Sequence, residues 1–102
     1  MLWFHPRSGL NLRWDAPATR ALRRAAPRVV LFAITNRCNL ACDFCSRDPG
    51  APSSWTGESA FATLAEFAQA GVLEVAFGGG EPLAFRGFDE LIERLGRDTP
   101  LA

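Results

Sequence analysis

The chain has 102 residues with equal numbers of acidic and basic side chains, so its formal net charge of zero argues against a general affinity for nucleic acid. At this length it forms at most one small domain, and its 48% of apolar residues suffices for a thin core. No apolar run approaches the roughly 20 residues that cross a bilayer, and the N-terminus does not resemble a signal peptide. We therefore expect a cytoplasmic protein without membrane contacts, whose thiols stay reduced.

The charge is divided unevenly along the chain. Residues 1–37 contain seven arginines and one acid, a net charge of +6, whereas residues 38–102 contain four arginines and ten acids, a net charge of −6. A basic half is a candidate docking face for an acidic partner. A solvated, arginine-rich helix explains the same pattern without any partner.

The N-terminal part predicts a β-hairpin followed by a short basic helix. Residues 6–9 supply a turn, and apolar side chains alternate with polar ones over residues 10–14. His5, the only histidine, is interpreted as structural. The helix is expected to open at Pro17 and to end before Pro27.

Two continuous apolar runs, Val29–Ile34 and Val72–Phe77, predict strands. Continuous apolarity, rather than alternation, is typical of strands that are covered on both faces of a parallel sheet. Each strand leads into a loop that contains unusual residues, cysteines in the first case and glycines in the second.

Each loop is followed by an amphipathic helix. The first helix is expected between Thr56, as its N-cap, and Gly71, as its C-terminal stop. The second helix is expected to end at Gly96. Their apolar faces carry Phe61, Leu64, Ala65 and Ala68 in the first helix and Phe88, Leu91, Ile92 and Leu95 in the second.

The order strand–loop–helix–strand–loop–helix predicts an α/β fold with two parallel strands and a right-handed crossover. Because both loops leave the carboxyl ends of neighbouring strands, they should lie at one edge of the sheet and face one cleft. Two parallel strands are too few for a comfortable sheet, since roughly three or more are normal. We therefore expect a fragment of a larger β/α barrel, or a subunit that needs a partner.

The three cysteines of the chain, Cys38, Cys42 and Cys45, fall within eight residues. Three thiolates can hold a 4Fe-4S cluster and leave one iron open to an outside ligand. Two alternatives remain: a core helix with the cysteines on one face, and a zinc site with His5 as the fourth ligand. The polar residues around the cysteines favour a loop over a helix.

The spacing Cys38-x3-Cys42-x2-Cys45, with Phe44 before the last cysteine, resembles the signature of the radical S-adenosylmethionine (SAM) superfamily. The Gly-Gly-Glu-Pro sequence of residues 79–82 is similar to the second motif of that family. The resemblance covers residues 28–96 and implies the N-terminal part of a partial (β/α)6 TIM-like barrel. Residues 1–27 then form the hairpin and basic helix, and residues 28–102 form the first two β/α units.

The resemblance also implies a mechanism. The three cysteines hold a 4Fe-4S cluster, the open iron binds SAM, and an electron from a flavodoxin- or ferredoxin-type donor cleaves SAM to a 5′-deoxyadenosyl radical that abstracts hydrogen from substrate. Glycine at positions 78–80 lets the backbone approach the methionyl group of SAM closely. The implied SAM-binding residues are Phe44, Gly78, Gly79, Gly80, Glu81 and Pro82.

The stretch Thr35–Leu40 looks most like the SPASM-type branch that modifies ribosomally made peptides, which implies a peptide substrate. Two other functions remain open. The chain could be a truncated or split module that holds the cluster and SAM without turnover and lacks a C-terminal half or partner subunit. It could also be a small zinc-binding interaction domain.

Overall fold

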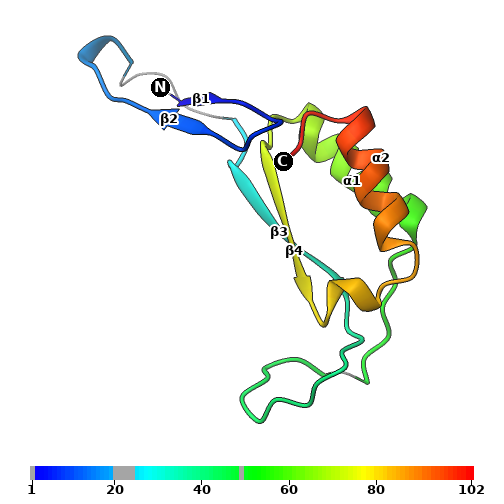
Figure 1. Cartoon of the computed structure of the whole chain (residues 1–102). Helices are drawn as coiled ribbons and strands as arrows, with labels where there is room; N and C mark the ends of the chain where they lie inside the picture. The colour runs from blue at the N-terminus through cyan, green and yellow to red at the C-terminus, as the bar shows by residue number, and fades with distance from the viewer. Residues whose placement is uncertain (1, 20–24, 49) are drawn as a thin grey trace.

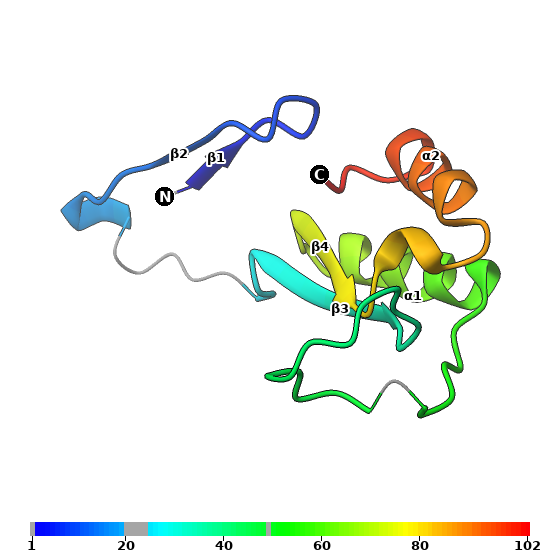
Figure 2. The ribbon, with the colours of Figure 1, turned by 60° about the horizontal axis from the view of Figure 1, so that its bottom comes forward.

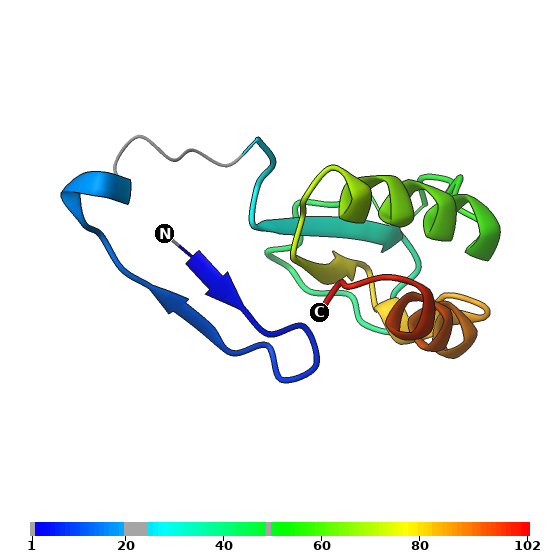
Figure 3. The same ribbon diagram turned by 90° about the horizontal axis from the view of Figure 1, so that it is seen from above.

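The computed structural model of the chain consists of an N-terminal hairpin and a parallel pair of strands that two helices cover on one side (Figure 1). The structure describes residues 2–19, 25–48 and 50–102. The hairpin lies beyond the amino ends of the parallel strands and away from the helices (Figures 1 and 3). The predicted α/β fold with two parallel strand–helix units after a hairpin is confirmed.

The hairpin pairs β1 (Leu2–Phe4) with β2 (Asn11–Arg13) in antiparallel register. Its turn is closed by two backbone hydrogen bonds, from His5 N–H to Leu10 O and from Gly9 N–H to His5 O, each 2.9 Å long. Gly9 adopts a φ of +66°, which glycine reaches without steric cost. The turn predicted at residues 6–9 is therefore confirmed.

The helix expected from Pro17 to Pro27 begins differently. Pro17–Thr19 form a 3₁₀ turn, η1, in which Thr19 N–H donates to Ala16 O (2.9 Å), so the first turn is tighter than the predicted α-helical one. Residues 20–24, which carry the three arginines of the predicted basic side, lie outside the described residues. The basic face and the domain boundary after residue 27 stay predictions.

The parallel sheet joins β3 (Val29–Thr35) to β4 (Glu74–Gly79), in register from Val29 opposite Glu74 to Ala33 opposite Gly78. The predicted second strand, Val72–Phe77, is thus two residues too early. Val72 is taken up by the C-terminal cap of the preceding helix, and the first two glycines of the predicted loop extend the strand instead.

Among the described residues, only one face of this sheet is covered, contrary to the prediction from its apolarity. Phe32 and Ile34 point into the core beneath the helices and are 6% and 0% exposed, whereas Leu31 on the other face is 84% exposed. Both helices lie on the same side of the sheet (Figure 1), so within the described part of the chain the alternate residues of β3 have no layer above them. The apolar open face includes Leu31 and Ala33.

The first helix, α1 (Gly57–Gln69), has the predicted ends. Thr56 Oγ1 accepts a hydrogen bond from Ser59 N–H (3.1 Å), and Ser59 Oγ accepts one from Thr56 N–H (2.9 Å), which completes a capping box. At the other end Gly71 has a φ of +99°. The bonds from Gly71 N–H to Ala68 O and from Val72 N–H to Phe67 O form a Schellman motif.

The second helix, α2 (Phe88–Asp98), continues two residues past the predicted stop at Gly96. A mid-helix glycine is costly but tolerated. The helix ends instead at Thr99, where both the N–H and Oγ1 donate to Leu95 O, at 3.0 and 2.7 Å. Neither α1 nor α2 is long and apolar enough to cross a bilayer, and no other helix of the described part is.

The core lies between the covered face of the sheet and the two helices. After α2 the chain returns to the sheet, where Leu101 is buried and Ala102 bonds to β4 on the edge away from β3. These bonds run from Val75 N–H to Ala102 O and from Ala102 N–H to Leu73 O, each 2.9 Å. The buried apolar residues are Phe32, Ile34, Ala60, Leu64, Val72, Leu91, Leu95 and Leu101.

Leu64 tests this core. Its side chain is fully buried, so Leu64→Ala should lower the free energy of unfolding by about 2–5 kcal/mol through lost burial and the cavity left behind. Urea titration followed by circular dichroism measures the change. The matched control is Leu83→Ala: because Leu83 is 78% exposed, the same truncation there should change stability by less than about 0.5 kcal/mol, and equal losses would contradict this packing.

Candidate functional site

The loops that follow β3 and β4 meet at the carboxyl edge of the sheet, as predicted. Gly80 N–H donates to Thr35 O (2.6 Å), and Glu81 N–H donates to Arg37 O (2.9 Å). These bonds join the loop that begins at Gly80, here called the glycine loop, to Thr35, Asn36 and Arg37. These three residues lead into the cysteine loop, which contains all three cysteines. Residues 36–56 extend from this junction as a long open loop, shown in Figure 2 with residue 49 outside the description. A cleft between the two loops stays a prediction.

The three glycines at positions 78–80 differ in whether the surrounding structure leaves room for a side chain. Gly79 has a φ of +105°, and a Cβ there would collide with Thr35 O; a Cβ on Gly80 would collide with Arg37 O. At these two positions the neighbouring backbone already requires glycine, before any cofactor is considered. Gly78 is different, because a Cβ there would meet nothing within 4 Å. Gly78 therefore faces free space at the end of β4.

Glu81 and Pro82 shape the exit from the glycine loop. Glu81 Oε1 accepts a hydrogen bond from Leu83 N–H (3.0 Å) and so caps the 3₁₀ turn η2 (Pro82–Ala84), with Pro82 at its first position. The Glu81 carboxylate is thereby used to hold the loop. This turn leads the chain from the sheet edge to α2.

Hydrogen bonds close the cysteine loop at its base. Ser53 Oγ accepts from Asn36 N–H (2.7 Å), and Asn36 Nδ2 donates to Ala51 O (3.2 Å). Thr35, which is only 3% exposed, receives Arg37 N–H on its hydroxyl oxygen (3.1 Å). These bonds hold Ala51 and Ser53, in the later part of the loop, beside its first residue.

Arg47 belongs to this base and was not found from the sequence. Its Nη2 donates to Asn36 O (3.0 Å) and its Nη1 to Thr35 O (3.4 Å). In the sequence it is only one of four arginines in the acidic part of the chain, and neither its position nor its neighbours indicate a contact with residues 35–36.

The cysteines themselves are free and exposed, in a segment of turns without regular structure. A turn joins the last two cysteines, with Cys45 N–H donating to Cys42 O (3.0 Å). The helical alternative is therefore wrong. Within the described residues, no group of three or more His, Cys, Asp or Glu side chains is gathered as a metal site.

The zinc alternative gains no support from His5. Its Nδ1 lies 2.8 Å from Ser8 Oγ, and its ring lies 6.0 Å from that of Trp3, so the histidine is used within the hairpin. The hairpin lies at the opposite end of the sheet from the cysteine loop (Figure 1). The structural role predicted for His5 agrees with these contacts.

The donor set fits an iron–sulfur cluster in kind and number. Three free thiols occur in one irregular segment, so gathering them around a common centre breaks no helix or strand. Phe44 beside them is 92% exposed and Leu40 is 67% exposed. These two apolar side chains beside the thiols are accessible to a ligand.

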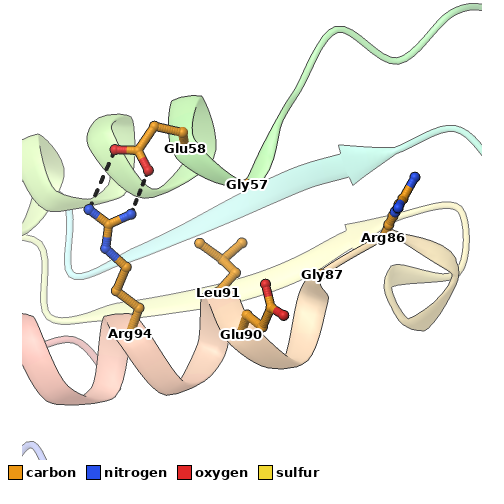
Figure 4. A pocket seen from close by; sticks show the side chains of 7 residues that line it. All are labelled: Gly57, Glu58, Arg86, Gly87, Glu90, Leu91 and Arg94. Carbon is orange, nitrogen blue, oxygen red and sulfur yellow. Dashed lines mark hydrogen bonds and ion pairs between the residues drawn. The ribbon is translucent and has the colours of Figure 1, made fainter.

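A separate hollow lies between the N-terminal ends of α1 and α2 (Figure 4). Arg94 crosses it from α2, with Nη1 2.6 Å from Glu58 Oε2 on α1 and its guanidinium 3.6 Å above the centre of the Phe61 ring. The hydrogen bond and the charge of Arg94 lower the pKa of Glu58 below its usual value. The lining residues are Gly57, Glu58, Arg86, Gly87, Glu90, Leu91 and Arg94.

Comparison with known proteins decides the family. The family model of the radical SAM superfamily matches residues 32–100, which includes both loops. The chain belongs to the radical SAM superfamily. No solved structure gives a significant match.

Curated relatives of this radical SAM chain include two kinds of cyclase. It is 40% identical over 70 residues to the PqqA peptide cyclase of Bradyrhizobium diazoefficiens, an alignment that covers 66% of the chain and 18% of the relative. It is 34% identical over 77 residues to the GTP 3′,8-cyclase of Aquifex aeolicus, covering 69% of the chain and 24% of the relative. The chain thus spans less than a quarter of the length of these relatives.

The glycine loop offers a matched pair of variants. Gly80→Ala should destabilise the chain by about 1–3 kcal/mol, because its Cβ would push the Arg37 backbone away. Gly78→Ala should change stability by no more than about 0.5 kcal/mol, since its Cβ meets open space. Urea titration of both variants measures the difference, and an equal loss for the two would contradict the close approach of the loops.

The pair of Glu58 and Arg94 predicts a pH dependence. Because the pKa of Glu58 is lowered in the folded state, its carboxylate stabilises the fold above the unfolded-state pKa, and that contribution is lost as pH falls through the folded-state pKa. Glu58→Gln should therefore be less stable than wild type at neutral pH, and the difference should shrink as the pH falls below 4.5, the usual pKa of a glutamate, and vanish only below the lowered folded-state pKa. Urea titrations across this range measure it. Glu90→Gln, in the same hollow, is the control, and a constant difference for Glu58→Gln at all pH values would contradict the assignment.

Proposed function

We propose that this chain holds a 4Fe-4S cluster through Cys38, Cys42 and Cys45 and binds SAM beside the glycine loop. The observation that carries the proposal is the backbone junction of the two loops, where Glu81 N–H bonds to Arg37 O. It holds the start of the cysteine motif beside the glycine motif at the carboxyl edge of the sheet, although 33 residues separate Cys45 from Gly78 in the sequence. Membership of the radical SAM superfamily supports the same pair of ligands.

The residues of the chain supply binding and orientation. The three thiolates would ligate iron and leave a fourth position for an outside ligand, and Gly78 leaves room for a group to approach the end of β4. Phe44 offers an exposed ring for stacking on a base such as adenine. When bound, the cluster supplies the electron for the reductive cleavage of SAM to a 5′-deoxyadenosyl radical. Glu81 and Pro82 hold the loop in place through the η2 turn.

A peptide is the substrate that we propose for the whole enzyme. The support is the sequence of residues 35–40, together with the 40% identity over 70 residues to a protein named a PqqA peptide cyclase. The setting would be a reducing cytoplasm with a flavodoxin- or ferredoxin-type electron donor. Because the chain spans less than a quarter of these relatives, turnover on a peptide is proposed only with the further barrel strands present, either in one chain or in a partner subunit.

Reconstitution with iron and sulfide under anaerobic conditions tests the cluster. The wild-type chain should gain the broad visible absorbance of an iron–sulfur protein and about four irons per chain. Cys42→Ala should lose both, because two thiolates cannot replace three as ligands of the cluster. Ser46→Ala, an exposed residue of the same loop, is the matched control and should behave as wild type.

The outcomes separate the candidate functions. A colourless complex with stoichiometric zinc would overturn the cluster in favour of a zinc-binding domain. With the cluster in place, formation of 5′-deoxyadenosine from SAM after reduction identifies an enzyme, whereas SAM binding without this product identifies a binding module.

Gly78 gives a direct test of the SAM site. A larger side chain, as in Gly78→Val, should weaken SAM binding by about tenfold or more, because it would fill the space at the end of β4. Calorimetric titration of the reconstituted protein measures the affinity. Unchanged affinity in a folded variant would place SAM elsewhere. Ile92→Val, on α2, is the control for small effects of repacking.

A further inference from the structure

We propose that Arg47 is a positioning residue that closes the cysteine loop and fixes it against the glycine loop. The inference rests on the proposed function, because the loop it closes is the one that would hold the cluster. The geometry concerns only this chain's own residues, however, so Arg47 is also testable without iron.

The contacts of Arg47 join three segments. Its guanidinium donates from Nη2 to Asn36 O (3.0 Å) and from Nη1 to Thr35 O (3.4 Å), two carbonyls at the start of the cysteine loop. The same Nη1 lies 3.4 Å from where a Cβ on Gly79 would stand, so the guanidinium packs directly against the glycine strand end. Arg47 itself follows Cys45 by two residues. One side chain, from a position just after the last cysteine, therefore contacts both the beginning of the loop and the end of β4.

These contacts suit arginine rather than another cation. The planar guanidinium presents several donors in a fixed fork, which allows it to bond two adjacent carbonyls at once, whereas a lysine ammonium is a single point of charge on a flexible stem. The Arg47 Nε–H is buried and has no hydrogen-bond partner among the described residues. A side chain that leaves a buried donor unpaired is held there by its remaining bonds and by packing, because such a donor is unfavourable to bury.

The position of Arg47 along the chain determines which residues its contacts enclose. The clamp joins residues 35–36 to residue 47, so all three cysteines lie within the closed segment. Holding the ends of a loop together lowers the conformational entropy that is lost when its middle is ordered. Arg47 thus lowers the entropic cost of gathering the three thiols around one centre. Its effect is indirect, because its contacts in the described structure are with the backbone at the start of the loop and with the end of β4.

Arg47→Ala tests this inference first in the metal-free chain. Without the clamp, the Gly80 and Glu81 amides, which bond to Thr35 O and Arg37 O, should exchange hydrogen about tenfold faster, while the amides of α1 keep their wild-type rates. Amide exchange followed by nuclear magnetic resonance measures both. Arg86→Gln, an exposed arginine at the N-terminal end of α2, is the matched control for loss of one positive charge. Wild-type exchange at Gly80 and Glu81 in Arg47→Ala would overturn the inference.

Arg47→Lys distinguishes the two-carbonyl geometry of the guanidinium from its positive charge. This variant also keeps the inference testable if Arg47→Ala fails to fold. Lysine keeps the positive charge but cannot bond both carbonyls with the same geometry, so exchange at Gly80 and Glu81 should lie clearly above the wild-type rate. Exchange equal to wild type in Arg47→Lys would overturn the requirement for a two-carbonyl clamp.

A second measurement uses the reconstituted protein. Iron release to a chelator, followed by the loss of visible absorbance, should be about tenfold faster in Arg47→Ala than in wild type or Arg86→Gln, because the ligands are less well held. Equal release rates would overturn the link between the clamp and the cluster. If the wild-type chain takes up no cluster, the proposed function fails, whereas the amide exchange still decides whether Arg47 closes the loop.

Discussion

The candidate site depends on how closely two backbone segments pass each other at the carboxyl ends of β3 and β4. Gly79 and Gly80 lie so near Thr35 and Arg37 that neither position has room for a side chain. Backbone hydrogen bonds from Gly80 and Glu81 to the same segment then fix the position of one loop relative to the other. A parallel strand pair brings both loops to one edge, and this contact sets them side by side there.

The glycines of this motif therefore have two separate physical roles. Those at 79 and 80 permit contact between parts of the protein, and the one at 78 leaves space at the strand end. From a sequence alone the three look alike, because each simply lacks a Cβ. The distinction matters for interpreting variants: a change at 79 or 80 alters the scaffold, whereas a change at 78 leaves the scaffold intact and alters only what can approach it.

The sequence predicted the elements well wherever local signals coincide. Thr56 and Gly71 bound α1 as expected, because a capping box and a left-handed glycine act within a few residues. The prediction of element ends was wrong where contacts with other residues determine them. β4 starts late because the Schellman motif takes up Val72, and α2 passes Gly96 because Thr99 provides the cap. In the site, the cysteine and glycine motifs were readable, whereas Arg47 was not, since its contacts with Thr35 and Asn36 arise only from the path of the loop.

The uncovered face of the sheet affects how this chain behaves in solution. Phe32 and Ile34 of β3 are covered, whereas Leu31 on the other face is exposed, so β3 presents an apolar side chain to water. Apolar area in water is unfavourable by about 25 cal/mol per Å², and that penalty is relieved by any surface that covers it. Any association through this face would bury apolar area rather than pair charges, so detergent, dilution and low salt should oppose it more effectively than a change in pH.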